Sequence, residues 1–163
     1  MSAAAGPANL DFTAASAADE IQNAIGERCK GANHNKVLAK DVENLVTKAL
    51  GVVQESGPFA CGLFLLSKAG DKPIEETPYE AVVACHILSR LLSLPAQYAL
   101  ADIQQAWRDG VLEPKQVNGA KSQIIPHLVK LAGVSIERLL LIKQIWERTL
   151  TYARYMARSR KEA

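Results

Sequence analysis

The end of the chain, TLTYARYMARSRKEA, combines residue types that can bind a phosphate backbone. An α-helix turns by about 100° per residue, so the cations of this stretch share one stripe. The stripe and its flanks consist of Thr151, Arg154, Arg158, Lys161, Arg148 and Tyr155. A guanidinium donates two parallel hydrogen bonds to a phosphate, and a tyrosine ring offers a surface on which an unstacked base can lie. The pattern predicts a nucleic-acid-binding helix, to which Arg160 adds charge.

The same residues also fit a simpler role. Cations near a helix C-terminus complement the negative end of the helix dipole, and they keep a terminal helix soluble. Two further lysines, Lys36 and Lys40, are spaced i, i+4 and therefore share one side of an expected helix, where they can extend a basic face. The sequence leaves both interpretations of the C-terminal cations open.

Charge is distributed unevenly along the chain. The formal net charge is only +2, but residues 138–163 carry +5 and the rest of the chain carries −3. Such asymmetry is typical of an electrostatic binding surface. It also suggests that the acidic N-terminal part of one copy could meet the basic end of the next copy in a head-to-tail stack. Self-association by stacking is therefore a hypothesis.

Catalytic and metal-binding patterns are absent from the sequence. His34, His86 and His127 lie far apart, and none has a second ligand at i+3 or i+4 on its helix. No glycine-rich phosphate loop or nucleophile elbow occurs. We therefore expect no catalytic residues, no metal and no cofactor. The alternative of an enzyme site assembled from dispersed residues, around His86 or His127, requires a deep pocket with a histidine beside a carboxylate.

Bulk composition describes a folded protein. The 163 residues are 48% hydrophobic and 22% charged, enough for one domain with a real core. The three cysteines, Cys29, Cys61 and Cys85, show no paired spacing, which fits a reducing compartment. Without a secretory leader pattern or an apolar run of membrane-spanning length, the expected location is cytoplasmic, with no membrane partner.

Helical periodicity dominates the rest of the chain, and alternation typical of strands is almost absent. Helices are expected over residues 15–29, 36–55, 59–68, 77–94 and 97–109, and from Ser135 to the end. Pro126 is expected to mark a kink or the start of a further helix. Thr77 and Glu80 form a capping box, with Pro78 in the first helical position. The segment 59–68 is apolar nearly all round, which predicts that it forms the buried centre.

These elements predict an all-α fold: a single-domain helical bundle of about six or seven helices with a long C-terminal helix. Residues 1–14, rich in alanine, glycine, serine and proline, are expected to form a disordered N-terminal segment, and residues 15–163 the helical bundle domain. Trp107 and Trp146 lie on apolar stripes and are expected to be packing anchors.

Two stretches carry a resemblance to a known family. VVQESGPFACGLFLLSKAG is a helix, a glycine turn and an apolar helix, and LLLIKQIWERTLTYARYMARSRK is a long final helix with an aromatic and basic end. Their order over residues 36–161 resembles the small, all-helical (Cmr-type) subunit of type III-B CRISPR RNA-guided effector complexes. The resemblance implies a role in antiviral defence, with helical bundles stacked along a ribonucleoprotein filament. By position, the family's basic, partner-facing residues correspond to Lys68, Arg154 and Arg158.

The sequence therefore predicts a non-catalytic helical subunit of an RNA-guided ribonucleoprotein complex that binds the RNA backbone without reading sequence. Its partners would be guide or target RNA and the other subunits, and its role would be to scaffold the filament. Phosphate contacts alone do not distinguish RNA from DNA. A protein–protein adaptor with no nucleic-acid role, marked by an exposed apolar patch, is the other alternative.

Overall fold

The protein is a bundle of α-helices in a computed structural model that describes residues 9–30, 35–69, 78–94, 113–117 and 119–161. The helices are α1 (Leu10–Ile21), α2 (Ala39–Ala69), α3 (Tyr79–Ser93), α4 (Lys121–Ala132) and α5 (Ile136–Lys161), with short 3₁₀ turns η2 (Gln22–Ala24) and η6 (Pro114–Gln116). Within the described ranges there are five α-helices, not six or seven. Two expected helices are joined in α2, and the expected helix over residues 97–109, with Trp107, lies outside the described residues.

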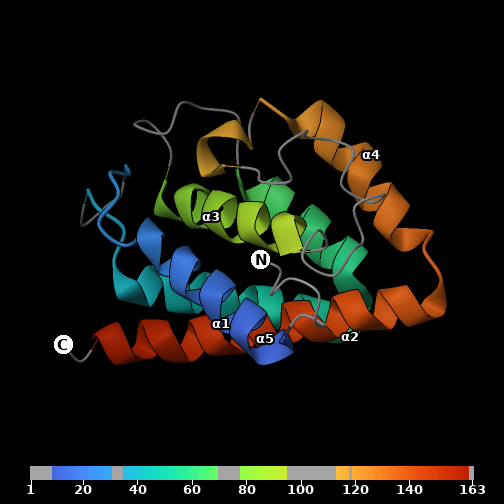
Figure 1. The fold of residues 1–163 in the computed structure, drawn as a ribbon. Helices are drawn as coiled ribbons and strands as arrows, with labels where there is room; N and C mark the ends of the chain where they lie inside the picture. The colour runs from blue at the N-terminus through green and yellow to red at the C-terminus, as the bar shows by residue number, and fades with distance from the viewer. Residues whose placement is uncertain (1–8, 31–34, 70–77, 95–112, 118, 162–163) are drawn as a thin grey trace, which may run out of the picture.

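The long helix α5 forms one side of the bundle (Figure 1). Both α1 and α2 pack along it, and α3 lies across the other side of α2. α4 packs on α2 at the end where α5 begins. The C-terminal end of α5 and the start of α2 therefore share the opposite end of the molecule.

α1 begins earlier than the sequence pattern indicated. Asn9 caps it by accepting a hydrogen bond from the backbone N of Phe12 at 3.2 Å, so residues 10–14, expected to be disordered, form its first turns. The expected helical end at residue 29 is also wrong, because α1 stops at Ile21 and η2 follows. The small side chains of Ala14, Ala17 and Ala18 are buried. Alanine lets two helix backbones approach closely, which is why a weakly hydrophobic stretch packs here.

α2 consists of two arms that meet at Gly57, where φ is 87° and ψ is 178°. A residue with a Cβ rarely adopts this positive φ, which favours glycine. Pro58 follows in the first turn of the second arm. The Sγ of Cys61 lies 3.5 Å from the carbonyl oxygen of Ala49, so the second arm lies back against the first. The predicted break between residues 55 and 59 is confirmed.

The buried centre is α3, not the segment 59–68. Every α3 residue from Ala81 to Ser89 is buried, whereas the second arm of α2 leaves Leu63 38% exposed. The apolar character of residues 59–68 misled the prediction, since one side of that arm faces solvent. The N-cap of α3 is Pro78, without a side-chain cap, and the predicted cap Thr77 lies outside the described residues.

α5 follows its predicted position, whereas α4 begins at Lys121, five residues before the expected kink or helix start at Pro126. α4 continues through Pro126, and the side chain of Ser135 accepts a hydrogen bond from the N of Arg138 at the start of α5. Trp146 is fully buried, which confirms its packing role. Where α4 crosses α2, a Cβ on Gly62 would overlap the side chain of Leu128, so any larger residue here would displace that leucine.

The three cysteines belong to the buried core. Cys29, Cys61 and Cys85 are free and buried, and burial raises the pKa of Cys61 to about 12 and that of Cys85 to about 11, so both stay protonated and unreactive. By length and composition alone, α2 could cross a membrane, contrary to the expectation from the sequence, but buried helices of soluble proteins pass the same test.

Candidate nucleic-acid interface

A single buried carboxylate joins the last turns of α5 to the beginning of α2. Glu43 is 7% exposed; its Oε2 accepts a hydrogen bond from Nε of Arg158 at 2.7 Å, and its Oε1 accepts one from Nζ of Lys161 at 2.8 Å. The hydrogen bonds from Lys161 and Arg158, in that order, lower the pKa of Glu43. The carboxylate is therefore ionised at neutral pH and fixes two cations of the predicted stripe.

Both cations remain accessible while they bind Glu43. The side chains of Arg158 and Lys161 are 47% and 42% exposed. Within the described part of the chain, Arg158 bonds Glu43 through Nε alone, which leaves the two terminal nitrogens of its guanidinium to other acceptors. One carboxylate offsets only one of the two positive charges. The pair can therefore still donate to a phosphate.

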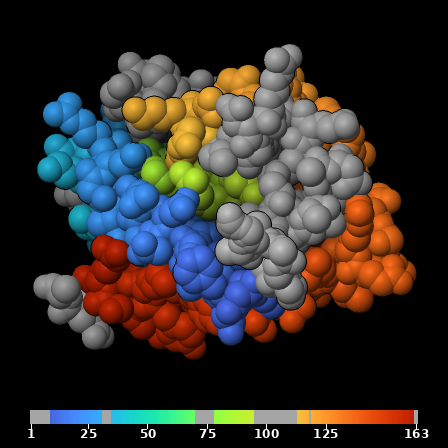
Figure 2. Space-filling view, in the orientation of Figure 1, coloured from blue at the N-terminus to red at the C-terminus, as the bar shows by residue number. Residues whose placement is uncertain are grey.

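Lys36 and Lys40 lie at the same end of the bundle, but not on one helix as expected. α2 begins at Ala39, and Lys36 lies in the segment before it, in an isolated β-bridge with Arg28. Both lysines are exposed, and Lys40 precedes Glu43 by less than one helical turn. Figure 2 shows the blue-to-cyan segment that leads into α2 and the red end of α5 at one end of the molecule. Among the described residues neither lysine has an ion-pair partner. We call the set formed by Lys36, Lys40, Arg158, Arg160 and Lys161 the basic end.

Three further candidate residues in the last turns of α5 differ in exposure: Arg160, Tyr155 and Arg154. Arg160 lies 3.7 Å from Asp19, with both side chains more than half exposed, so this contact is weak. Tyr155 is 57% exposed, as a stacking surface must be. Arg154 is half-buried, and its Nε is buried without a hydrogen-bond partner in the described structure.

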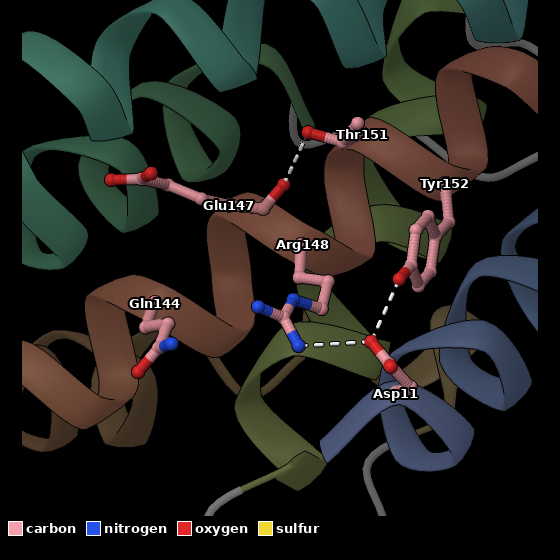
Figure 3. Close-up of a pocket in the computed structure, with 6 residues that line it drawn as sticks. All are labelled: Asp11, Gln144, Glu147, Arg148, Thr151 and Tyr152. Carbon is pink, nitrogen blue, oxygen red and sulfur yellow. Dashed lines mark hydrogen bonds and ion pairs between the residues drawn. The ribbon is translucent and has the colours of Figure 1, made fainter.

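Arg148 is used elsewhere, in a contact between α5 and α1. Its Nη1 donates to Oδ1 of Asp11 at 2.9 Å, and the hydroxyl of Tyr152 donates to the same oxygen at 2.8 Å (Figure 3). The hydrogen bond from Tyr152, followed by the charge of Arg148, lowers the pKa of Asp11. The same contact raises the pKa of Tyr152. These hydrogen bonds connect the first turn of α1 to the middle of α5.

The hollow around this contact has a volume of about 410 Å³ and mixed charge. Gln144, Glu147 and Thr151 complete its lining, and the Glu147 side chain points away from Asp11 in Figure 3. Arg148 lies ten residues before Arg158, about 15 Å along the helix axis. The structure therefore separates Arg148 from the basic end, with which the sequence had grouped it.

Lys68 is also separate from the basic end. Its Nζ lies 3.5 Å from Glu80, which also pairs with Lys48 at 3.6 Å, and 5.7 Å from the ring centroid of Phe64. Lys68 and Lys48 thus share one carboxylate where the two arms of α2 approach α3. Among the candidate residues outside α5, Lys36 and Lys40 lie at the end of the bundle where α5 ends, and Lys68 does not.

The acidic and basic parts of the sequence form ion pairs with each other within one chain. Asp11 and Asp19 on α1 face Arg148 and Arg160 on α5, and Glu43 on α2 holds Arg158 and Lys161. The complementary charges that suggested head-to-tail stacking thus pair α1 and α2 with α5. This explanation of the asymmetry needs no second copy.

A second polar hollow contains His86, which the alternative of a dispersed enzyme site had singled out. His86 is 5% exposed, and its Nε2 lies 3.0 Å from Oε2 of Glu27. The hollow measures about 360 Å³, and Arg90, which pairs with Glu20 at 2.7 Å, also lines it. A histidine beside a carboxylate in a pocket is the arrangement that this alternative requires.

The chemistry of the His86 hollow is limited by its lining. The lining residues are Asn23, Glu27, His86, Arg90, Glu113, Pro114 and Lys115. None of these described residues is a serine, threonine or cysteine, so they provide no hydroxyl or thiol nucleophile. Nor do the described residues include three clustered side chains that could hold a metal ion. The hollow could support proton transfer by His86, oriented by Glu27, but no covalent step on a hydroxyl or thiol.

The residue of the candidate site that sequence reasoning missed is Glu43. It lies 115 residues before Arg158 in the chain, so no local spacing relates the two. One signal was present: Glu43 lies between Val42 and Leu45 in the apolar pattern of the expected helix 36–55. A carboxylate at a buried position requires a cationic partner, and the C-terminal arginines and lysine were available.

Comparison with protein-family models, with curated proteins and with solved structures finds no match. The resemblance to the small CRISPR subunit therefore stays a prediction from the order and pattern of the helices.

Proposed function

We propose that this protein is a non-catalytic helical subunit of an RNA-guided, type III CRISPR-like ribonucleoprotein complex, and that its basic end binds the RNA backbone. The observation that carries the proposal is that Glu43 holds Arg158 and Lys161 at the end of the bundle where the exposed Lys36 and Lys40 also lie. Cations from α5 and from residues 36–40, far apart in sequence, make a surface that one strand can contact at several successive phosphates. The choice of complex rests on the resemblance of residues 36–161.

Glu43 would act as a positioning residue. Long cationic side chains lose rotamer freedom when they bind, and that loss opposes binding. The bonds of 2.7 Å and 2.8 Å already restrict Arg158 and Lys161 in the free protein. A phosphate would then approach the terminal guanidinium nitrogens and the ammonium group, while Lys36 and Lys40 supply charge unopposed by a local carboxylate partner in the described chain.

Tyr155 would contribute an exposed aromatic surface near these cations. It precedes Arg158 by three residues, so the two side chains are neighbours on the surface of α5. A base stacked on an exposed ring, beside phosphates held by cations, is a common way to bind a single strand without reading its sequence. The protein would thereby hold RNA extended while another subunit performs any chemistry.

The proposal is tested by fluorescence anisotropy of a labelled single-stranded RNA at low salt. Lys36→Ala/Lys40→Ala should weaken binding by about tenfold or more, because each lost phosphate contact removes counterion release. The matched control, Lys48→Ala/Lys143→Ala, removes the same charge elsewhere, from lysines that lie 3.6 Å and 3.9 Å from their carboxylates. It should bind nearly as well as the wild type.

Each other outcome has a definite meaning. Equal weakening by the two double variants would show that only net charge matters, and would contradict a defined basic end. No binding by the wild type at low salt would return the C-terminal cations to a solubilising role and favour the adaptor function. Tighter binding of single-stranded DNA than of the matching RNA would contradict RNA as the ligand.

A further inference from the structure

The corner where α4 meets α5 exposes a run of aliphatic side chains. Ile125 and Val129 on α4 are 46% and 55% exposed, and Ile136 and Leu140 on α5 are 72% and 60% exposed. Each pair is spaced i, i+4, so it lies on one face of its helix. These four residues make up half of the large hydrophobic side chains that are exposed in the described structure.

The core of the monomer does not need these side chains. α4 buries Ile124, Leu128 and Leu131, and α5 buries Ile142 and Ile145. Each helix therefore carries an inward apolar stripe and a second, outward aliphatic pair. A concentration of outward aliphatic groups at one place is typical of a protein interaction surface.

Two opposite charges border this apolar corner. Lys130 follows Val129 and Glu137 follows Ile136, and both charged residues are exposed. Neither makes an ion pair with another described residue. The corner thus presents an aliphatic pair with a cation on α4 and an equally spaced aliphatic pair with an anion on α5.

We propose that this corner binds the same corner of a second copy of the chain across a two-fold axis. In that arrangement α4 packs against α5 of the partner, and Lys130 lies opposite the partner's Glu137. Two features favour a second copy as the occupant: the equal i, i+4 spacing of the two aliphatic pairs, and the opposite charges beside them. A two-fold axis forms each contact twice. The interface does not depend on RNA binding, because it uses the end of the bundle opposite the basic end.

The test is sedimentation analysis of the full chain over a wide range of concentrations. The wild type should form dimers. Lys130→Glu and Glu137→Lys should each place like charges across the axis and raise the dimer dissociation constant by about tenfold or more. When the two single variants are mixed, every charge has an opposite partner again, so a mixed dimer should form. Circular dichroism checks that each variant is folded.

Two further variants locate the interface. Leu140→Glu should give monomers, whereas Leu38→Glu, at an exposed leucine on the opposite end of the bundle, should leave the dimer intact. A wild type that stays monomeric at the highest concentration would overturn the proposal. So would single charge variants that dimerise as well as the wild type, or a mixture of them that stays monomeric. RNA binding by the basic end is measured separately, so either proposal can fail alone.

Discussion

Arg158 donates a hydrogen bond from Nε to Oε2 of Glu43 at 2.7 Å, across 115 residues of sequence. The bond joins the last turns of α5 to the beginning of α2, at the end of the molecule where the exposed Lys36 and Lys40 lie. Lys161 binds the other oxygen of the same carboxylate. One acidic residue therefore both stabilises the packing of α5 and arranges the cations that we propose bind RNA.

Replacing Glu43 with glutamine should lower the free energy of unfolding by about 1–3 kcal/mol at neutral pH, because two charge-assisted hydrogen bonds are weakened. We expect the lower part of this range, because water screens the cations, which are 47% and 42% exposed. Urea unfolding measures this change. Glu55→Gln, at an exposed position of the same helix, is the control and should change stability by less than about 0.5 kcal/mol. Equal effects of the two variants would contradict a special role for Glu43.

The stability contributed by Glu43 should also depend on pH. Its folded pKa lies below the ordinary value of 4.5, so its contribution is present above that pH and is lost as pH falls through the folded pKa. Acid unfolding of the wild type should therefore be steeper below about pH 4.5 than that of Glu43→Gln. Identical slopes in this range would show that Arg158 and Lys161 do not hold the carboxylate in solution.

His127 should produce a second, separate pH dependence. It is 2% exposed, and burial lowers its pKa from 6.5 to about 4. The folded state therefore excludes a proton that the unfolded chain binds, so stability falls as pH drops from 6.5 towards 4, by about 3 kcal/mol at most. The free energy of unfolding should depend less on pH across this window in His127→Leu than in the wild type. In Glu43→Gln the dependence should stay steep. An unchanged slope in His127→Leu would exclude His127 as the cause.

Two glycines of α2 should respond in opposite directions to alanine. A Cβ on Gly51 meets nothing within 4 Å, so Gly51→Ala should stabilise the helix by about 0.5–1 kcal/mol. A Cβ on Gly62 would overlap Leu128, so Gly62→Ala should destabilise the protein by about 1–3 kcal/mol. Gly62→Ala should cost less in a Leu128→Ala background than in the wild type, because the overlapping atoms are absent there. Thermal unfolding of these variants tests the packing of α4 on α2.

The sequence predicted the elements better than their contacts. Helical periodicity, the Gly57–Pro58 break and the start of α5 at Ser135 are local properties, and the structure confirms each of them. The start of α1 was missed because its core face is built from alanines, whose weak hydrophobic signal resembles that of a disordered segment. The central position of α3 depends on which helices cover it, which no local pattern contains.

The candidate site was predicted in part for the same reason. Helical spacing correctly gave Tyr155 an exposed position and placed Arg158 and Lys161 on one side of α5. It could not show that Arg148 binds Asp11, because that ion pair joins residues 137 positions apart. The grouping of Lys36 and Lys40 with the end of α5 likewise depends on how α2 packs against α5, which only the folded chain establishes.

Tyr155 offers a test of stacking that leaves charge unchanged. The ring is 57% exposed, so Tyr155→Ala should not affect the fold. Loss of a stacked base should weaken RNA binding by about 1–3 kcal/mol, and Tyr155→Phe, which keeps the ring, should bind almost as well as the wild type. Anisotropy at constant salt measures both. If Tyr155→Ala binds like the wild type, the RNA contact consists of phosphates alone.

The most direct test of the proposed function is the salt dependence of RNA affinity in wild-type protein and in Lys36→Ala/Lys40→Ala. For a single strand, each phosphate contact contributes about 0.7 to the slope of log affinity against log salt. We predict that affinity falls steeply with salt in the wild type, and that the slope decreases by about 1 or more in the variant. An unchanged slope, equal to that of Lys48→Ala/Lys143→Ala, would contradict phosphate binding at the basic end.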